Sequence, residues 1–109
     1  MKHGMWLNAS AAAGLGLLLL CTGAAAQEFA PAQISKGGEL YARNCASCHG
    51  KRMANPDWAI DLKKFPTDEQ SRFVNSVTNG KNSMPPWGDV FSAEEVLALW
   101  AYVVAGESR

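Results

Sequence analysis

Two thiols and one imidazole are spaced in this chain so that they could act together. Cys45 and Cys48 are separated by two residues, and His49 follows the second cysteine directly. At that spacing the two thiols project from one helical turn and could form thioethers with the two vinyl groups of a porphyrin. The next side chain then faces the iron of the tethered ring, so His49 would be an axial ligand. The motif predicts covalent attachment of one haem c.

A zinc site and a dithiol redox pair are the other chemistries that a Cys-x-x-Cys motif can serve. A structural zinc site needs a second pair of ligands, but the remaining thiol and imidazole, Cys21 and His3, both lie in the apolar first part of the chain. A thioredoxin-like pair would follow a strand of a βαβ unit. The residues before Cys45 have helical spacing instead, so both alternatives are weaker than haem.

The group on the other side of the iron decides between electron transfer and ligand binding. Met84 is the predicted second axial ligand, rather than simple core filling, because it lies 35 residues after His49 in a Ser-Met-Pro-Pro segment. The paired prolines predict a stiff, extended loop there. Met53 is the competing thioether, but it follows His49 by only four residues and would have to pass around the ring. The Pro56 carbonyl is the predicted acceptor for the second ring N–H of His49.

The first 26 residues have the pattern of a secretory signal. A basic residue near the start is followed by an apolar stretch and by the small residues Ala24–Ala26, which predicts cleavage before Gln27 and a periplasmic location. The apolar stretch is short and rich in Ala and Gly for a permanent membrane helix, which needs about 20 apolar residues, so no stable membrane anchor is expected. An uncleaved N-terminal anchor is the alternative.

The predicted mature chain is long enough for one domain. We expect a linker over residues 27–33 and one domain over residues 34–109. Cleavage would remove one of the ten basic residues and none of the ten acidic ones, which leaves a net charge of −1. This near-neutral, scattered charge carries no nucleic-acid signature.

Helical spacing dominates the predicted domain. A first helix is expected over residues 34–44, where Gly37 and Gly38 indicate close approach by another backbone. A loop with Trp58 follows, and that indole could either line the haem or fill the core. Thr67 and Gln70 have the spacing of a capping box for a second helix, which Asn79-Gly80 would end.

The last predicted helix has the clearest boundaries. Ser92 and Glu95 form a second predicted capping box, and Phe91 and Val96 occupy the positions of a hydrophobic staple. Apolar residues then recur at helical spacing to about Ala105, before the stop expected at Gly106. With no convincing strand in the sequence, the predicted fold class is all-α.

Three segments together resemble the class I c-type cytochromes over essentially the whole predicted mature chain. They are Gly37-x-x-x-Tyr41-x-x-x-Cys45-x-x-Cys48-His49, then Ser83-Met84-Pro85, then Leu99-x-x-Tyr102. The resemblance implies a cytochrome c fold in which the first and last helices cross, with His/Met ligation and a partly exposed haem edge. Within that family, Asn55–Trp58, Met84–Asp89 and Leu99–Val103 look like small cytochromes that accept electrons from periplasmic quinoprotein alcohol dehydrogenases.

The sequence thus predicts a non-catalytic electron carrier. His49 is the only imidazole after the leader and the haem would occupy it, so no Ser, His and acid set remains for nucleophilic catalysis. The expected partners are redox proteins, with a dehydrogenase as donor and an oxidase or another cytochrome as acceptor. One alternative is a gas-binding or peroxidatic haem protein with a labile sixth ligand, and another is a module fused to, or stably bound by, a dehydrogenase.

Overall fold

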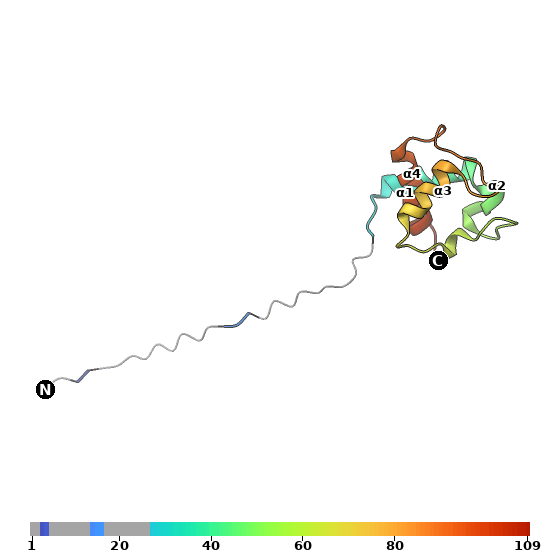
Figure 1. Ribbon diagram of the computed structural model, residues 1–109. Coiled ribbons are helices and arrows are strands. Elements are labelled where there is room, and N and C mark those ends of the chain that lie inside the picture. Colours follow the sequence, from blue (N-terminus) through green and yellow to red (C-terminus); the bar gives the residue numbers. More distant parts are fainter. Residues whose placement is uncertain (1–2, 5–13, 17–26) are drawn as a thin grey trace.

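The computed structural model describes residues 3–4, 14–16 and 27–109 (Figure 1). The predicted signal peptide and its cleavage site fall almost entirely outside the described residues, so they stay predictions. Among the helices of the described residues, none is long and apolar enough to cross a membrane.

The part of the chain from residue 27 onward is built from helices, which confirms the all-α prediction. It contains four α-helices and two short 3-10 helices, and the only β pairing in these residues is an isolated bridge between Lys81 and Met84. In chain order the elements are α1 (Pro31–Asn44), α2 (Ala46–His49), η1 (Lys51–Met53), η2 (Leu62–Lys64), α3 (Gln70–Asn79) and α4 (Ala93–Ala105).

Helix α1 begins three residues earlier than its apolar spacing predicted. Pro31 occupies the first turn, where its fixed φ suits a helix and its missing N–H is no loss. The Ala30 carbonyl then accepts from the backbone N–H groups of Gln33 and Ile34 at 2.9 and 3.1 Å. The residues expected to form the end of a linker therefore form the first turn of the helix.

Helices α1 and α4 cross in contact at Gly37, as the glycines predicted (Figure 1). A Cβ atom at Gly37 would lie 1.9 Å from the Ala98 carbonyl oxygen, so only glycine allows the two backbones to approach this closely. At the neighbouring Gly38, the facing group is the ring of Tyr102. That ring also packs on Tyr41, with 5.1 Å between ring centroids.

Both ends of α4 lie where the sequence predicted them. The Ser92 hydroxyl accepts from the Glu95 backbone N–H at 3.1 Å, and the Glu95 carboxylate accepts from the Ser92 backbone N–H at 3.0 Å. Phe91 and Val96, the predicted staple, are both buried, and Gly106 caps the C-terminal end. These interactions are local, so they form wherever this stretch of sequence is helical.

The start of α3 was predicted wrongly. No capping box forms between Thr67 and Gln70, because the Glu69 N–H donates to the Pro66 carbonyl at 3.2 Å and the residues between them make a turn. The helix therefore starts at Gln70 with Glu69 as its N-cap residue, without a side-chain cap. Its end is as predicted, since Gly80 adopts a φ of 78° just after Asn79.

An aromatic cluster joins α3 and α4 to the segment that precedes α3. Phe65 and Phe73 each pack on Trp100, with ring centroids 6.0 and 5.1 Å apart. Trp100 is 1% exposed, and Leu99 and Val103 on the same helix are also buried. Burying such side chains contributes about 1.5–3 kcal/mol each, so α4 is the centre of the core.

Candidate functional site

The two thiols of the Cys-x-x-Cys motif lie on one turn of helix. Helix α1 ends at Asn44, and the Cys45 carbonyl then accepts from the backbone N–H groups of Cys48 and His49 at 3.2 and 2.9 Å. Residues three apart on such a turn lie on the same face. Both cysteines are free and partly buried, so the residues present fit a group that is attached through two adjacent thioethers.

The Cys45 thiol is not activated for redox exchange. Burial, and then the neighbouring Cys48, raise its pKa to about 11. The attacking thiol of a dithiol redox pair needs the opposite shift, toward a lower pKa. The raised pKa of Cys45 therefore gives no support to a thioredoxin-like role.

The imidazole of His49 is fixed by a carbonyl farther along the chain than predicted. Its Nδ1 lies 3.1 Å from the Ile60 carbonyl oxygen, so the prediction of Pro56 as the acceptor is wrong. After His49 the chain coils through Gly50, with a φ of 90°, and then through η1. Because the chain spends several residues in this coil, the carbonyl that contacts the His49 ring belongs to Ile60 and not to Pro56.

The bond to Ile60 determines which ring nitrogen of His49 is free. A carbonyl oxygen only accepts, so Nδ1 must carry the hydrogen in this arrangement. The lone pair of Nε2 is then available to a metal, which is the usual state of a ligating histidine. His49 is therefore held in a form that fits an iron-bound imidazole.

A tyrosine that the sequence had linked only to helix packing also supports this turn. The Tyr41 hydroxyl donates to the Gly50 carbonyl at 2.5 Å, directly after His49. Burial is the main cause that raises the pKa of this phenol above its usual range. Tyr41 lies one helical turn before Cys45. From that spacing alone, the sequence could have predicted that Tyr41 faces the haem motif.

Met84 is held in a tight turn rather than in a fully extended loop. The Met84 N–H donates to the Lys81 carbonyl at 2.9 Å, and the Lys81 N–H donates to the Met84 carbonyl at 3.1 Å. Beyond the prolines, the N–H groups of Trp87 and Gly88 donate to carbonyls at the end of α3, at 2.8 and 3.0 Å. The backbone around Met84 is thus fixed on both sides.

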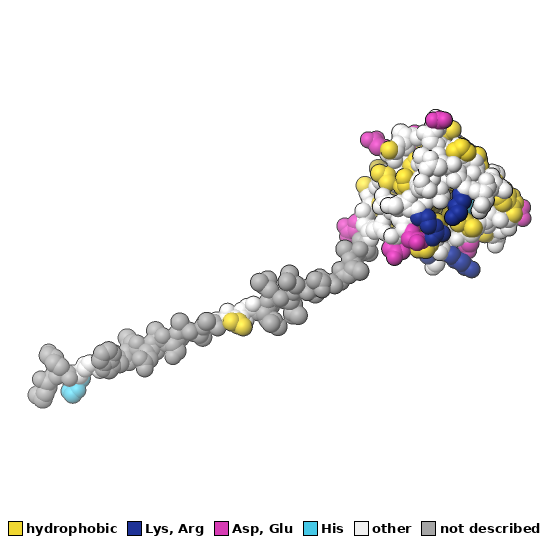
Figure 2. Space-filling view, in the orientation of Figure 1, with side chains coloured by type: hydrophobic (Ala, Val, Ile, Leu, Met, Phe, Trp, Pro, Cys, Tyr) yellow, Lys and Arg dark blue, Asp and Glu magenta, His cyan; other side chains and the backbone are white. Residues whose placement is uncertain are grey.

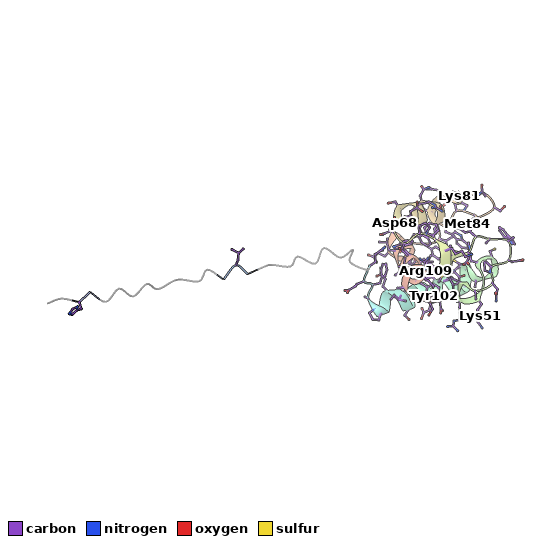
Figure 3. All side chains as sticks on the ribbon, turned by 90° about the horizontal axis from the view of Figure 1, so that it is seen from below. Lys51, Asp68, Lys81, Met84, Tyr102 and Arg109 are labelled. Atoms are coloured by element: carbon purple, nitrogen blue, oxygen red, sulfur yellow. The ribbon has the colours of Figure 1, made fainter. Side chains whose placement is uncertain are left out.

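The side chain of Met84 is partly buried and packs against the same hydrophobic core as Cys45 (Figure 3). The competing thioether, Met53, is 1% exposed and is itself a member of that core. Trp58 is 63% exposed, which rules out the prediction that its indole fills the core and leaves the haem-lining role as a prediction.

Gly80 is the residue on which the Met84 turn depends. Its φ of 78° disfavours any side chain, and a Cβ there would lie 2.7 Å from the Met84 carbonyl oxygen and 2.9 Å from the Pro86 nitrogen. We expect Gly80→Ala to lower the free energy of unfolding by about 1–2 kcal/mol. Denaturant unfolding of the haem-loaded protein measures this loss.

Ser83→Ala is the matched control for Gly80→Ala. Ser83 is exposed in the same turn and has no positive φ, so its replacement should leave the unfolding midpoint nearly unchanged. Equal stability of Gly80→Ala and Ser83→Ala would contradict the role given to Gly80.

Comparison with known proteins matches most of the described domain to one family. A family model described as "Cytochrome C oxidase, cbb3-type, subunit III" matches residues 32–103. Cytochrome c6 of Microcystis aeruginosa is 38% identical over 74 residues, which cover 63% of this chain and 91% of that protein. The chloroplastic cytochrome c6 of Chlamydomonas reinhardtii is 34% identical over 101 residues, covering 86% and 67%.

Solved structures share the same fold. The quinohemoprotein alcohol dehydrogenase ADHIIG of Pseudomonas putida HK5 matches with a TM-score of 0.64 and 28% identity, over 73% of this chain but only 12% of that one. Cytochrome c6 of the diatom Phaeodactylum tricornutum matches with a TM-score of 0.52 and 29% identity, over 67% of this chain and 92% of that one.

With its helix crossing, its Cys-x-x-Cys turn and these relatives, the protein belongs to the class I c-type cytochromes, as a single-haem member of the cbb3-type subunit III family. Within that class it is similar to cytochromes c6. Cys45 and Cys48 therefore carry covalent haem c with its iron. The protein is a cytochrome c electron carrier, and its cytochrome c6 relatives are carriers rather than enzymes.

Proposed function

We propose that this cytochrome is a periplasmic single-electron carrier in which His49 and Met84 are the two axial ligands of the iron. The observation that carries the proposal is the fixed orientation of His49, whose Nδ1 bonds to the Ile60 carbonyl and whose Nε2 is free. The haem, when bound, supplies an iron that alternates between ferric and ferrous states. The protein supplies the ligands and a rigid, largely apolar surround.

The proposed ligand pair suits electron transfer. A thioether is a soft ligand that favours ferrous iron and raises the reduction potential. The reciprocal hydrogen bonds between Lys81 and Met84 hold the backbone of that ligand in place. A ligand whose backbone is held by hydrogen bonds moves little when the charge of the metal changes. The structural rearrangement that accompanies electron transfer therefore stays small.

A dehydrogenase is the proposed electron donor, and a terminal oxidase or another cytochrome the proposed acceptor. The proposal of a quinoprotein alcohol dehydrogenase rests on the segments Asn55–Trp58 and Met84–Asp89. It is supported by the likeness to a quinohemoprotein alcohol dehydrogenase, of whose length this chain spans 12%. An acceptor of the oxidase class is supported by the description of the matching family.

The periplasmic location rests on the predicted signal peptide. Gln27, the first residue after the predicted cleavage site, is already part of the fold. Its side chain accepts from the Trp100 indole N–H at 3.2 Å and donates to the Thr67 carbonyl. Cleavage before Gln27 would therefore leave these contacts intact.

Redox-titrated visible spectroscopy of the protein, expressed with a haem-attachment system, tests the ligand proposal. We expect a weak ferric band at the red end of the spectrum, characteristic of sulfur ligation, which disappears on reduction. Carbon monoxide should bind the untreated ferrous protein slowly. Rapid binding of carbon monoxide without the sulfur band would instead support the gas-binding or peroxidatic alternative.

The donor is tested separately by rapid mixing with a reduced quinoprotein alcohol dehydrogenase. Fast reduction of the cytochrome at low salt supports that enzyme as the partner. Reduction no faster than that by a dehydrogenase of another cofactor class would contradict it, without affecting the proposed iron ligands.

A further inference from the structure

The carbonyl that fixes His49 lies in a loop with little support of its own. Residues 55–60, all of which the structure describes, form no backbone–backbone hydrogen bond. The loop also carries exposed apolar side chains, with Trp58 and Ile60 63% and 60% exposed. The position of the Ile60 carbonyl therefore depends on how the ends of the loop are held.

The C-terminal residue holds the end of the loop nearer to Ile60. Nη2 of Arg109 donates to the Leu62 carbonyl at 2.9 Å and to the Phe65 carbonyl at 2.8 Å. These two carbonyls lie at either end of η2, which begins two residues after Ile60. The C-terminal end accordingly lies beside the yellow-green segment that contains η2 (Figure 1).

The opposite end of the loop is tied to the same C-terminal segment. Arg52 forms a bidentate ion pair with Glu107, with N···O distances of 3.2 and 3.0 Å, and the Tyr102 hydroxyl donates to Glu107 at 3.0 Å. The Arg52 side chain is 73% exposed, and solvent weakens such a pair. Figure 2 shows Lys and Arg side chains, in dark blue, on the face of the domain that it draws. Arg109, bonded to the carbonyls of two buried residues, is the stronger anchor.

We propose that Arg109 is a positioning residue for the haem ligand His49. By holding η2, it keeps the Ile60 carbonyl within hydrogen-bond reach of Nδ1. That bond increases the basicity of the other ring nitrogen, which faces the metal in a ligating histidine. The inference rests on the proposed ligation by His49.

Loss of this positioning and loss of charge act in opposite directions on the reduction potential. Weakening the bond to Ile60 makes His49 a poorer electron donor, which disfavours ferric iron and raises the potential. Removing a positive charge from the surroundings of the iron favours the more positive ferric state and lowers the potential. The difference in potential between a variant that loses both the anchor and the charge and one that loses only a charge therefore separates the two effects.

Arg109→Ala and the matched control Arg72→Ala, both as haem-loaded protein, provide the test. Arg72 also lies against this segment, with its guanidinium carbon 4.6 Å from the centre of the Phe65 ring and its partner at Glu69. It bonds to no carbonyl of the loop. Both substitutions remove one positive charge, but only Arg109→Ala removes the hydrogen bonds to the Leu62 and Phe65 carbonyls.

The first readout is deuterium exchange of the His49 Nδ1–H, followed by NMR, and the second is the midpoint potential. We expect exchange to become at least about tenfold faster in Arg109→Ala, a change of about 1.4 kcal/mol in local opening, with a midpoint potential above that of Arg72→Ala. Arg72→Ala should leave exchange unchanged. Arg109→Lys, which keeps the charge but lacks the planar fork, should lie between wild type and Arg109→Ala, and it carries the test if the alanine variant does not fold.

Unchanged exchange, together with equal downward shifts in potential for Arg109→Ala and Arg72→Ala, would overturn the positioning role. A wild-type protein with attached haem whose His49 ring signals in the NMR spectrum of the ferrous protein are not shifted by the haem would instead contradict the proposed ligation by His49. The two failures are therefore distinguishable.

Discussion

Replacing Met84 with alanine is expected to leave the haem covalently attached while lowering the reduction potential and opening the iron to carbon monoxide. The covalent bonds depend on Cys45 and Cys48, which the substitution does not touch. The turn should also survive, because its two hydrogen bonds to Lys81 use only backbone atoms. The methyl side chain of alanine offers no ligand, so water or an added gas takes the sixth position.

The fall in potential should be large. Loss of the thioether would remove the proposed ligand that favours ferrous iron, and axial ligands set the reduction potential of haem proteins over a span of about 0.8 V. We expect a decrease on the order of 0.1–0.3 V within that span, loss of the red ferric band and rapid carbon monoxide binding. Potentiometric titration and gas-binding kinetics measure these changes.

Met53→Leu is the control for Met84→Ala. Met53 is the other thioether of the domain and is fully buried, so a volume-conserving replacement should cost less than about 1.5 kcal/mol in stability. Its potential and spectrum should match those of wild type. If Met84→Ala kept the wild-type spectrum and Met53→Leu lost it, the two methionines would have been assigned the wrong way round.

Gly37→Ala is expected to have the largest effect on stability. The added Cβ would lie 1.9 Å from the Ala98 carbonyl oxygen, 2.6 Å from the Ala98 carbonyl carbon and 2.9 Å from the Tyr102 Cβ. Two of these atoms belong to the backbone of α4, so relief requires the helices to separate. Alanine gains about 1 kcal/mol in helix propensity, but overpacking of this kind costs more, and we expect a net loss of about 2–3 kcal/mol.

The neighbouring glycine provides a matched control. At Gly38 an added Cβ would approach only the Tyr102 ring, at 3.2 and 3.3 Å. A side-chain ring shifts more easily than a helix backbone, so Gly38→Ala should cost much less than Gly37→Ala or be neutral. Denaturant unfolding of both variants makes the comparison. Similar unfolding midpoints would mean that the close approach of α1 and α4 does not depend on glycine at position 37.

Features set by local interactions were predictable from the sequence. The cap at Ser92 and Glu95 and the stop at Gly80 each involve residues within a few positions of one another, and the structure has both. The crossing at Gly37 is not local, but it was predictable because a glycine inside a helix is costly unless another backbone lies close.

Features that depend on the path of the chain were not predictable in the same way. A capping box at Thr67 was locally plausible, yet the turn at Pro66 uses these residues differently. The acceptor for His49 could not be found by counting residues, because the coil through Gly50 determines which carbonyl returns to the ring. The contact of Arg109 with η2 joins parts of the chain more than forty positions apart, and no spacing rule anticipates it.

The contact between Gly37 and Ala98 also bears on the order of events during biogenesis. These residues are 61 positions apart in the chain, and closing so long a segment is slow compared with forming a single helix. Helix α1 cannot pack against α4 until α4 has been synthesised. During that interval we expect Cys45, which is partly buried in the finished fold, to be more accessible for haem attachment. We therefore expect haem attachment to precede the closure of α1 on α4.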